Sequence, residues 1–149
     1  MYFVTKTFAE LSARELYGIY FLRSEVFVVE QQCAYQDPDD KDLKALHVMV
    51  IDFEKLIGYS RILAPGISYK EASIGRLAVK KEFRGVGAGK KLMNYCIHKT
   101  LQLYKNQDIV ISAQSYLFKF YTELGFVKEG SKYDEDKIPH VKMRYKQQL

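Results

Sequence analysis

The hydrophobic and polar positions of this chain repeat with two periods, and each period predicts a different kind of element. Short runs rich in β-branched and aromatic residues predict strands, whereas apolar residues spaced three and four apart predict helices with one buried face. The predicted strands are 2–7, 46–52, 56–63, 72–79, 109–111, 126–127 and 141–145, and the predicted helices are 12–28, 85–104 and 117–124.

Local signals mark the ends of these helices. Ser12 is followed three residues later by Glu15, a capping box that predicts the start of the first helix. Gly125 directly follows the third helix, where glycine often ends a helix because it accepts a left-handed backbone. The apolar face consists of Val86, Met93, Ile97, Leu101 and Tyr104 in the second helix, and of Leu117, Phe120, Tyr121 and Leu124 in the third.

The order of elements is β, α, β, β, β, α, β, α, β, β. This order predicts an α/β domain in which helices cover the faces of a mixed sheet. The continuous apolar run 109–111 is typical of a strand that is buried on both faces. The chain shows no repeat and no linker, and its 149 residues fit one domain, so we expect a single domain over 1–149.

Composition narrows the class of protein. Hydrophobic residues make up 48 % of the chain and charged residues 28 %, which excludes a disordered chain. No stretch has the apolar length that spans a bilayer, and the first residues lack the features of a signal peptide, so we expect a cytoplasmic protein without membrane association. Cys33 and Cys96 have neither metal-binding nor paired spacing, so we expect two reduced thiols and no metal.

The net charge is +5, which suits nucleic acid, a membrane surface or a small polyanion. Most of the positive charge is scattered, and no recognition helix or single-strand motif is apparent, so we expect no nucleic-acid partner. One local cluster flanks a glycine-rich run and favours a phosphate-bearing ligand: Lys80, Lys81, Arg84, Lys90 and Lys91.

Three phosphate-binding patterns are candidates for the run Arg84–Gly89. The dinucleotide pattern G-x-G-x-x-G fails at Lys90, and the Walker A pattern fails at Arg84 and Lys91. The pattern [QR]-x-x-G-x-[GA], opening a helix after a strand, fits every position. Because Gly87 and Gly89 lack side chains, a pyrophosphate can approach the backbone N–H groups at the helix start. A glycine-rich turn without a ligand remains the alternative.

Three segments in order carry a resemblance to a known family: the strand 73–79, the run Arg84–Gly89, and Phe120-Tyr121-Thr122-Glu123-Leu124-Gly125-Phe126. Together they resemble the GNAT superfamily of acetyl-CoA-dependent N-acetyltransferases. The chain is also similar to the narrower ElaA-like group, through residues 22–37, His47, Ala113-Gln114 and Ile138–Val141. Gln114 stands where many members of the superfamily have an asparagine that reaches the pantetheine arm.

The resemblance implies a sheet that splays between its fourth and fifth strands, with helices on both faces. The pantetheine arm of the coenzyme would lie in that gap and bond to the backbone of the fourth strand. It also implies that a tyrosine hydroxyl lies near the sulfur, so Tyr121 is the candidate acid for the leaving thiolate, although its apolar face equally suits packing in the core. The coenzyme-binding positions implied in this chain are Leu77, Ala78, Val79, Arg84, Gly85, Val86, Gly87, Ala88, Gly89, Lys90, Gln114 and Tyr121.

The acceptor side is less defined. An alkyl ammonium must lose a proton before it attacks a thioester, so a base is needed. Glu30, His47 and His140 are the candidates for this base, with Glu30 and His140 preferred as catalytic groups. The candidate substrate-binding residues are Glu30, His47, Arg76 and His140. A histidine base suits neutral pH. If Arg61 and Arg76 face the cleft, they orient an acidic substrate.

The resemblance implies transfer of an acetyl group from acetyl-CoA, used as a cosubstrate, to the amine of a small molecule, peptide or protein. The alternative is a sensor or partner module that binds acyl-CoA without turnover. Pairing through the last strand often makes dimers in this superfamily, so a homodimer is an open expectation.

Overall fold

The computed structural model describes residues 1–147 and shows the expected elements in the expected order, with one additional short strand, Tyr133–Glu135, before the last. The strands are β1 (Tyr2–Thr7), β2 (Leu46–Asp52), β3 (Lys55–Leu63), β4 (Ser73–Val79), β5 (Ile109–Gln114), β6 (Val127–Lys128), β7 (Tyr133–Glu135) and β8 (Ile138–Tyr145). The helices are α1 (Ala13–Arg23), which continues as a π-helical segment over Ser24–Glu30, α2 (Ala88–Leu103) and α3 (Phe118–Glu123).

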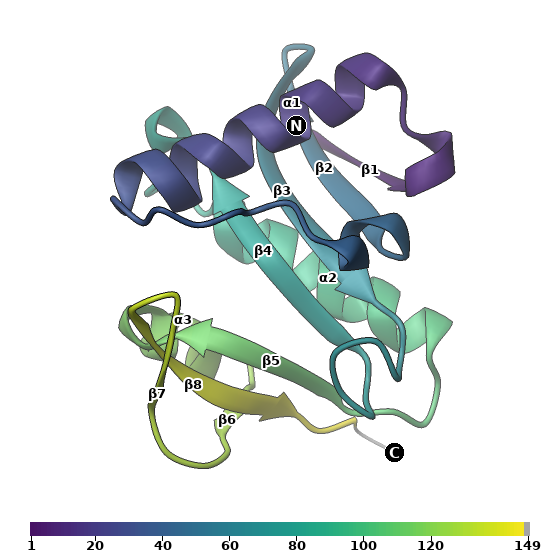
Figure 1. The fold of residues 1–149 in the computed structure, drawn as a ribbon. Helices are drawn as coiled ribbons and strands as arrows, with labels where there is room; N and C mark the ends of the chain where they lie inside the picture. Colours follow the sequence, from purple (N-terminus) through teal and green to yellow (C-terminus); the bar gives the residue numbers. More distant parts are fainter. Residues whose placement is uncertain (148–149) are drawn as a thin grey trace.

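The strands form two antiparallel sheets that diverge from one end (Figure 1). The first sheet has the order β1-β2-β3-β4, and the second has the order β5-β8-β6 with β7 paired to β8. Among the described residues, one isolated parallel bridge joins Ala72, directly before β4, to Ile109 at the start of β5, and the Val110 N–H donates to the Ala72 carbonyl at 3.0 Å. Beyond that bridge the strands separate, so the splay expected between the fourth and fifth strands is present.

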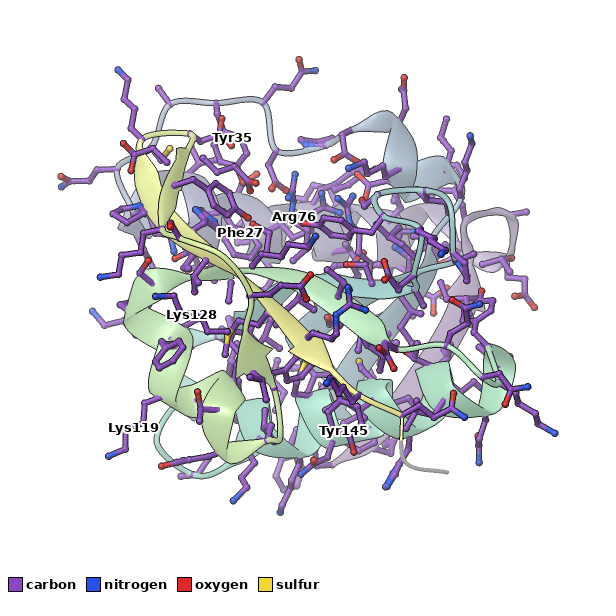
Figure 2. All side chains as sticks on the ribbon, turned by 90° about the horizontal axis from the view of Figure 1, so that it is seen from below. Phe27, Tyr35, Arg76, Lys119, Lys128 and Tyr145 are labelled. Carbon is purple, nitrogen blue, oxygen red and sulfur yellow. The ribbon has the colours of Figure 1, made fainter. Side chains whose placement is uncertain are left out.

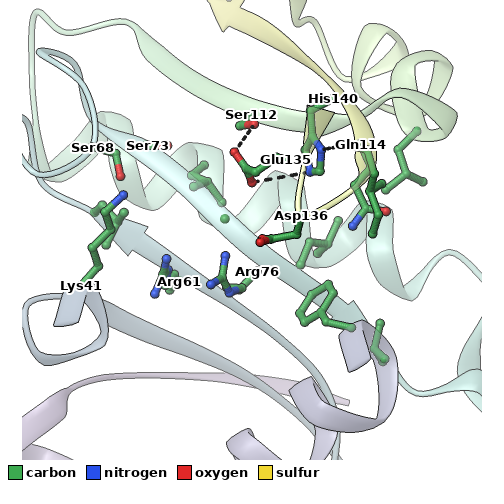
Figure 3. A pocket seen from close by; sticks show the side chains of 18 of the residues that line it. Lys41, Arg61, Ser68, Ser73, Arg76, Ser112, Gln114, Glu135, Asp136 and His140 are labelled. Atoms are coloured by element: carbon green, nitrogen blue, oxygen red, sulfur yellow. Dashed lines mark hydrogen bonds and ion pairs between the residues drawn. The ribbon is translucent and has the colours of Figure 1, made fainter. Parts of the chain in front are cut away.

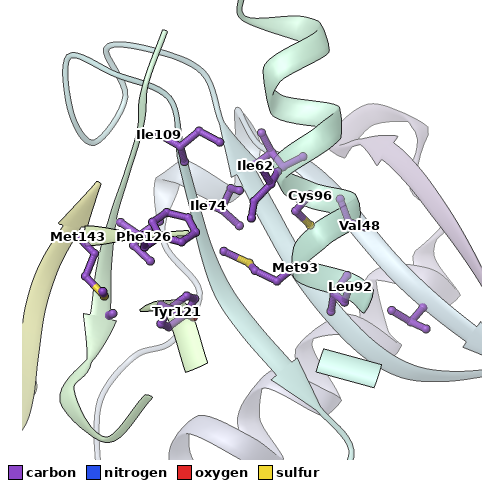
Figure 4. Close-up of a cluster of buried hydrophobic side chains, with 14 of the residues drawn as sticks. Val48, Ile62, Ile74, Leu92, Met93, Cys96, Ile109, Tyr121, Phe126 and Met143 are labelled. Atoms are coloured by element: carbon purple, nitrogen blue, oxygen red, sulfur yellow. The ribbon is translucent and has the colours of Figure 1, made fainter. Parts of the chain in front are cut away.

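Two layers of helix cover the first sheet, α1 on one face and α2 on the other (Figure 1). Alternation along β2 explains this arrangement, because Val48 and Val50 pack with α2 whereas Met49 packs with α1. The larger core continues from α2 across β4 and β5 to α3, and Figure 4 shows Met93, Ile74 and Tyr121 within it. Each sheet is therefore anchored to the same apolar core.

Two helix boundaries differ from the sequence prediction. Ser12 caps α1 as expected, with its Oγ accepting from the Glu15 N–H at 3.0 Å. The regular helix ends at Arg23, however, and π-helical turns follow it. Helix α2 begins at Ala88 and not at Gly85, because Gly85 and Gly87 have φ angles of 81° and 83°, outside the helical region.

The apolar face predicted for α2 is wrong at one position, since Val86 precedes the helix and is 72 % exposed.

The hairpin of β7 and β8 was not expected from the sequence. Its turn places Asp136 and Lys137 at φ angles of 50° and 64°, a conformation that usually selects glycine or asparagine, so the composition carried no turn signal. In the part of the chain that the structure describes, no helix is long and apolar enough to span a bilayer.

Candidate coenzyme and acceptor site

The start of α2 has features that suit an anion, as the sequence predicts. Gly87 is its N-cap and offers no side-chain acceptor, so the first N–H groups of the helix lack the partner that a serine or aspartate supplies elsewhere. These donors and the helix dipole favour a negative group at this point. A Cβ built on Gly85 or Gly87 meets nothing within 4 Å, so the space in front of both glycines is open.

Arg84 is held at the edge of this loop by two contacts. Its Nε donates to the Val79 carbonyl at 2.9 Å, and its Nη2 donates to Glu30 Oε2 at 2.7 Å. Both side chains remain partly exposed, 42 % for Arg84 and 27 % for Glu30. The structure therefore places Glu30 beside the glycine-rich loop, whereas the sequence suggested a place on the acceptor side.

Strand β4 leads from this loop into a pocket. Leu77, Ala78 and Val79 form its last three residues, and Ala78 and Val79 pair with β3 on one side only. Because β5 diverges, the other backbone edge of this segment has no strand partner among the described residues. Gly89 lies against this end, with an added Cβ 3.6 Å from Val79 Cγ2 and 3.9 Å from the Phe120 ring.

A bulge in β4 turns Arg76 toward the pocket. Tyr59 pairs with Ala78 and Arg61 pairs with Gly75, so β4 has one more residue than β3 over this interval. Arg76 adopts a φ of 53° there, and Ser60 Oγ donates to the Gly75 carbonyl at 2.9 Å. Pairing between strands, and not local sequence, sets the direction of this side chain.

The pocket has a volume of about 250 Å³ and lies between the two sheets. Figure 3 shows Lys41 and Ser68 at one end and Gln114 and His140 at the other, with Glu135 and Asp136 facing Arg76 across the space. Leu77 and Tyr121 also line the pocket, so it connects with the free edge of β4. It therefore gathers Tyr121, Gln114, His140, Arg76 and Leu77 from the predicted set and leaves Glu30 and His47 outside.

Tyr121 faces both the core and the pocket. Its ring packs edge-on against Phe120 and Phe126, and the residue is 7 % exposed. Burial raises the pKa of the Tyr121 hydroxyl above its usual value of 10.0, with Tyr116 and Cys96 acting in the same direction. The hydroxyl therefore stays protonated and keeps a proton to donate. Packing and a role at the site are compatible in this position.

His140 belongs to a polar cluster on the second sheet. Its Nδ1 donates to the Ile138 carbonyl at 2.7 Å, because a carbonyl oxygen can only accept, and its Nε2 lies 3.7 Å from Glu135 Oε2. Ser112 Oγ donates to Glu135 Oε1 at 3.3 Å and also hydrogen-bonds the Tyr133 hydroxyl. When His140 is neutral, its free Nε2 and the Glu135 carboxylate are two acceptors on the same wall.

His47 is fully buried, away from the pocket. Its Nε2 donates to the Asp42 carbonyl at 2.8 Å, and its Nδ1 accepts from the Tyr59 hydroxyl at 2.6 Å. Burial lowers the pKa of His47 below 6.5, which favours this neutral form. Both ring nitrogens are thus satisfied within the protein.

Two contacts close one side of the pocket. The amides of Gln31 and Gln114 exchange hydrogen bonds of 3.0 and 3.3 Å between the end of the π-helical segment and the end of β5. The Cys33 thiol donates to the Asp136 carbonyl at 3.1 Å, at the tip of the β7–β8 hairpin. Residues 31–33 therefore bridge the opening between the two sheets.

The opposite wall rests on a buried ionic network of three arginines and three aspartates. Arg76 Nε lies 2.8 Å from Asp37, and its guanidinium lies 6.0 Å from the centre of the Tyr35 ring (Figure 2). The other ion pairs join Arg23 to Asp37 and Asp42, Arg61 to Asp39 and Asp42, and Arg76 to Asp39. The formal charges of these six groups cancel.

Sequence reasoning did not single out Lys41, Gln31, Ser112, Glu135 and Asp136, all of which line the pocket. No local motif marks them, since they come together only when the loop 31–44 and the β7–β8 hairpin fold over the sheets. Residues 1–147 contain no group of three or more His, Cys, Asp or Glu side chains placed to hold a metal ion.

Comparisons with known proteins agree with this geometry. The sequence model described as "Acetyltransferase (GNAT) domain" matches residues 9–147. A UPF0039 protein of Synechocystis is 41 % identical over 93 % of this chain and 91 % of its own. An acyl-CoA N-acyltransferase of Pseudomonas aeruginosa superposes with a TM-score of 0.91 at 37 % identity, covering 97 % of this chain and 99 % of that one. Escherichia coli ElaA gives a TM-score of 0.91 at 33 % identity with the same coverage.

Proposed function

Because the chain belongs to the GNAT acetyltransferase family, we propose that it transfers an acetyl group from acetyl-CoA to the amine of a small molecule. The membership confirms the resemblance inferred from the sequence, including the ElaA-like group. Membership of the family does not specify the donor or the acceptor, so acetyl-CoA as the donor and a small amine as the acceptor are our proposal. The name of the Pseudomonas relative, an acyl-CoA N-acyltransferase, supports a CoA thioester as the donor.

The observation that carries the proposal is the continuity of β4. Its residues Arg76 and Leu77 line the pocket, and Val79 accepts a hydrogen bond from Arg84 at the glycine-rich loop. One strand thus connects the start of α2, where an anion would bind, with the pocket between the sheets. That layout fits a ligand with phosphates at one end and a reactive group at the other, and the open space at Gly85 and Gly87 fits a pyrophosphate.

In the proposed reaction, an N–C bond forms as the thioester C–S bond breaks. The ammonium acceptor loses two protons in total, one of which ends on the CoA thiol while the other is released. Free CoA and an amide are the products. Bound acetyl-CoA would supply the activated acyl group. In this chain, His140 Nε2 and Glu135 are the acceptors available to the amine protons, and the Tyr121 hydroxyl is the available donor for the thiolate. Backbone N–H groups on the free edge of β4 would stabilise negative charge on the acyl oxygen.

The size of the pocket favours a small acceptor. Its volume of about 250 Å³ falls below the range of roughly 300–1,000 Å³ usual for drug-sized ligands. The bridges from residues 31–33 narrow its access further. A lysine on the surface of a folded protein would have to displace these contacts, whereas a free amine would not.

The test is release of CoA thiol from acetyl-CoA in the presence of a panel of small amines, with the acetylated product identified by mass spectrometry. We expect turnover with at least one class of amine, and stabilisation of the protein by acetyl-CoA alone. The sensor alternative predicts equal stabilisation without turnover. Absence of both binding and turnover would contradict the proposal.

A further inference from the structure

The unpaired charges that line the pocket are of opposite sign on its two facing walls: Lys41 on one, and Glu135 and Asp136 on the other. We infer that the acceptor is a small amine that also carries a carboxylate, with its carboxylate at Lys41 and its ammonium beside Glu135 and His140. The inference rests on the proposed function, since it names the class of substrate for the same site.

On the wall that rests on the ionic network, Lys41 carries a positive charge that no carboxylate among the described residues compensates. The arginines beside it are matched by Asp37, Asp39 and Asp42, as described above, so they contribute little net charge. Lys41 is half-buried and lines the pocket, yet no carboxylate of residues 1–147 lies within 4.0 Å of its Nζ. An anionic ligand in the pocket would give this ammonium the counter-ion that it lacks.

Arg61 supplies a second unsatisfied donor on the same wall. It is 4 % exposed, and its Nη1 and Nη2 bond to Asp39 and Asp42. Its Nε–H is buried and has no acceptor among the described residues. The Ser68 and Ser73 hydroxyls line the same end.

The other wall carries the opposite charge. Glu135 and Asp136 both line the pocket, and neither lies within 4.0 Å of a lysine or arginine nitrogen among residues 1–147. Glu135 Oε2 and His140 Nε2 are 3.7 Å apart, and with neutral His140 both are acceptors. An ammonium between them would satisfy both atoms at once.

The order of these groups along the pocket fixes the orientation. Gln114 and His140 lie at one end of the pocket, and Lys41 with Ser68 lies at the opposite end (Figure 3). The acyl group would be transferred at the first end. The amine must reach the first end. A carboxylate on the remote end of the same molecule then meets Lys41. A diamine would instead place a second cation against Lys41, and an uncharged tail would leave Lys41 unpaired.

The experiment compares matched pairs of acceptors in the unmodified full chain. Each pair shares its amine and chain length, for example 4-aminobutanoate with 4-aminobutanamide, and glycine with glycinamide. We expect the kcat/KM of the carboxylate to exceed that of the amide by about tenfold or more in the pair of best length, the scale of one charge-assisted contact. Equal values, or preference for the amide, would overturn the inference.

Two variants test where the carboxylate and the ammonium of the acceptor bind. In Lys41→Met, the ratio of kcat/KM between the carboxylate and the amide should fall toward one. The KM of the carboxylate should rise while its kcat changes little, because the contact is equal in ground and transition states. Lys44→Met, an exposed lysine on the same turn, is its control and should keep the preference. Glu135→Gln should raise the KM of both members of a pair, since both carry the ammonium. Asp134→Asn, at the neighbouring exposed residue, is its control and should leave both KM values unchanged.

The outcomes separate this inference from the proposed function. Turnover of carboxylate-free amines with an unchanged preference in Lys41→Met overturns the inference and leaves acetyl transfer standing. Stabilisation by acetyl-CoA without turnover of any amine removes both. Preference for the carboxylate that Lys41→Met abolishes and Lys44→Met retains supports both.

Discussion

Glu30 and Arg84, which are 54 residues apart in the sequence, form an ion pair of 2.7 Å beside the start of α2. The pair joins the end of the π-helical segment to the glycine-rich loop. It keeps the Arg84 guanidinium next to the helix N-terminus, where a phosphate would bind. It also places a carboxylate at the same point, so if the coenzyme binds here as proposed, Glu30 would both position Arg84 and compete with the phosphate for it.

The first prediction follows from this competition. Glu30→Gln should lower the dissociation constant of acetyl-CoA by up to about fivefold, since an exposed ion pair is worth about 1 kcal/mol at most. It should leave the KM of the amine unchanged, because Glu30 lies outside the pocket. Isothermal titration and steady-state kinetics measure the two quantities. Glu82→Gln, an exposed carboxylate near the same loop, is the control, and a loss of amine specificity in Glu30→Gln would return Glu30 to the acceptor side.

The second prediction concerns Gly87. Gly87→Val should abolish the thermal stabilisation by acetyl-CoA, because a branched side chain fills the open space before α2 and disfavours the φ of 83°. Unmodified protein at 100 times the dissociation constant should gain about 2.7 kcal/mol. Gly130→Val carries similar strain, with a φ of 88°, and has open space around it. It should lose intrinsic stability yet keep the response to acetyl-CoA, and a retained response in Gly87→Val would contradict the coenzyme assignment.

The third prediction concerns Tyr121. Tyr121→Phe removes the hydroxyl but keeps the ring contacts with Phe120 and Phe126, so fold and coenzyme affinity should hold. If the hydroxyl protonates the leaving thiolate, kcat should fall by roughly 10²–10⁴. Single-turnover kinetics separate the chemical step from product release. An unchanged chemical step would leave Tyr121 with a packing role only.

Sequence patterns predicted the fold well because its signals are local. The capping box of Ser12 and Glu15 and the glycine after α3 are set by neighbouring residues and appear where expected. The start of α2 was misjudged because Val86 matches the helical period, although two glycines with positive φ surround it. A period alone does not reveal which apolar residue is exposed.

The pocket proposed for the acceptor was harder to predict from the sequence, since its walls depend on contacts between distant segments. Arg76 faces the pocket because β4 bulges against β3, and no residue near it signals the bulge. His47 stood out as a titratable residue in a strand, yet its two ring nitrogens bond within the core. Lys41 and Glu135 carry no motif and acquire a role only from their positions on facing walls.

The ionic network beneath the pocket should make the stability of the fold depend on pH. Burial opposes ionisation of Asp42, but hydrogen bonds and charge from Arg23 outweigh it and hold the pKa of Asp42 at about 2, below its usual 3.8. Asp42 also bonds Arg61 at 2.7 Å. Since the folded pKa lies below the unfolded one, this carboxylate stabilises the fold above about pH 4, and the contribution is lost as the pH falls toward 2.

The last prediction is a two-stage loss of stability in acid, measured by urea unfolding from pH 8 to pH 2. Burial lowers the pKa of His47 below 6.5, so its neutral form stabilises the fold above that pH and the contribution declines below it. A steeper loss of about 2 kcal/mol should follow between about pH 4 and pH 2 from Asp42.

Asp42→Asn should be destabilised by about 3 kcal/mol at pH 7, because two buried arginines lose a partner, and its second stage should be flattened. Asp40→Asn, an exposed aspartate on the same turn, should retain both stages. An identical acid profile in Asp42→Asn and in the unmodified protein would contradict the assignment of the second stage to Asp42.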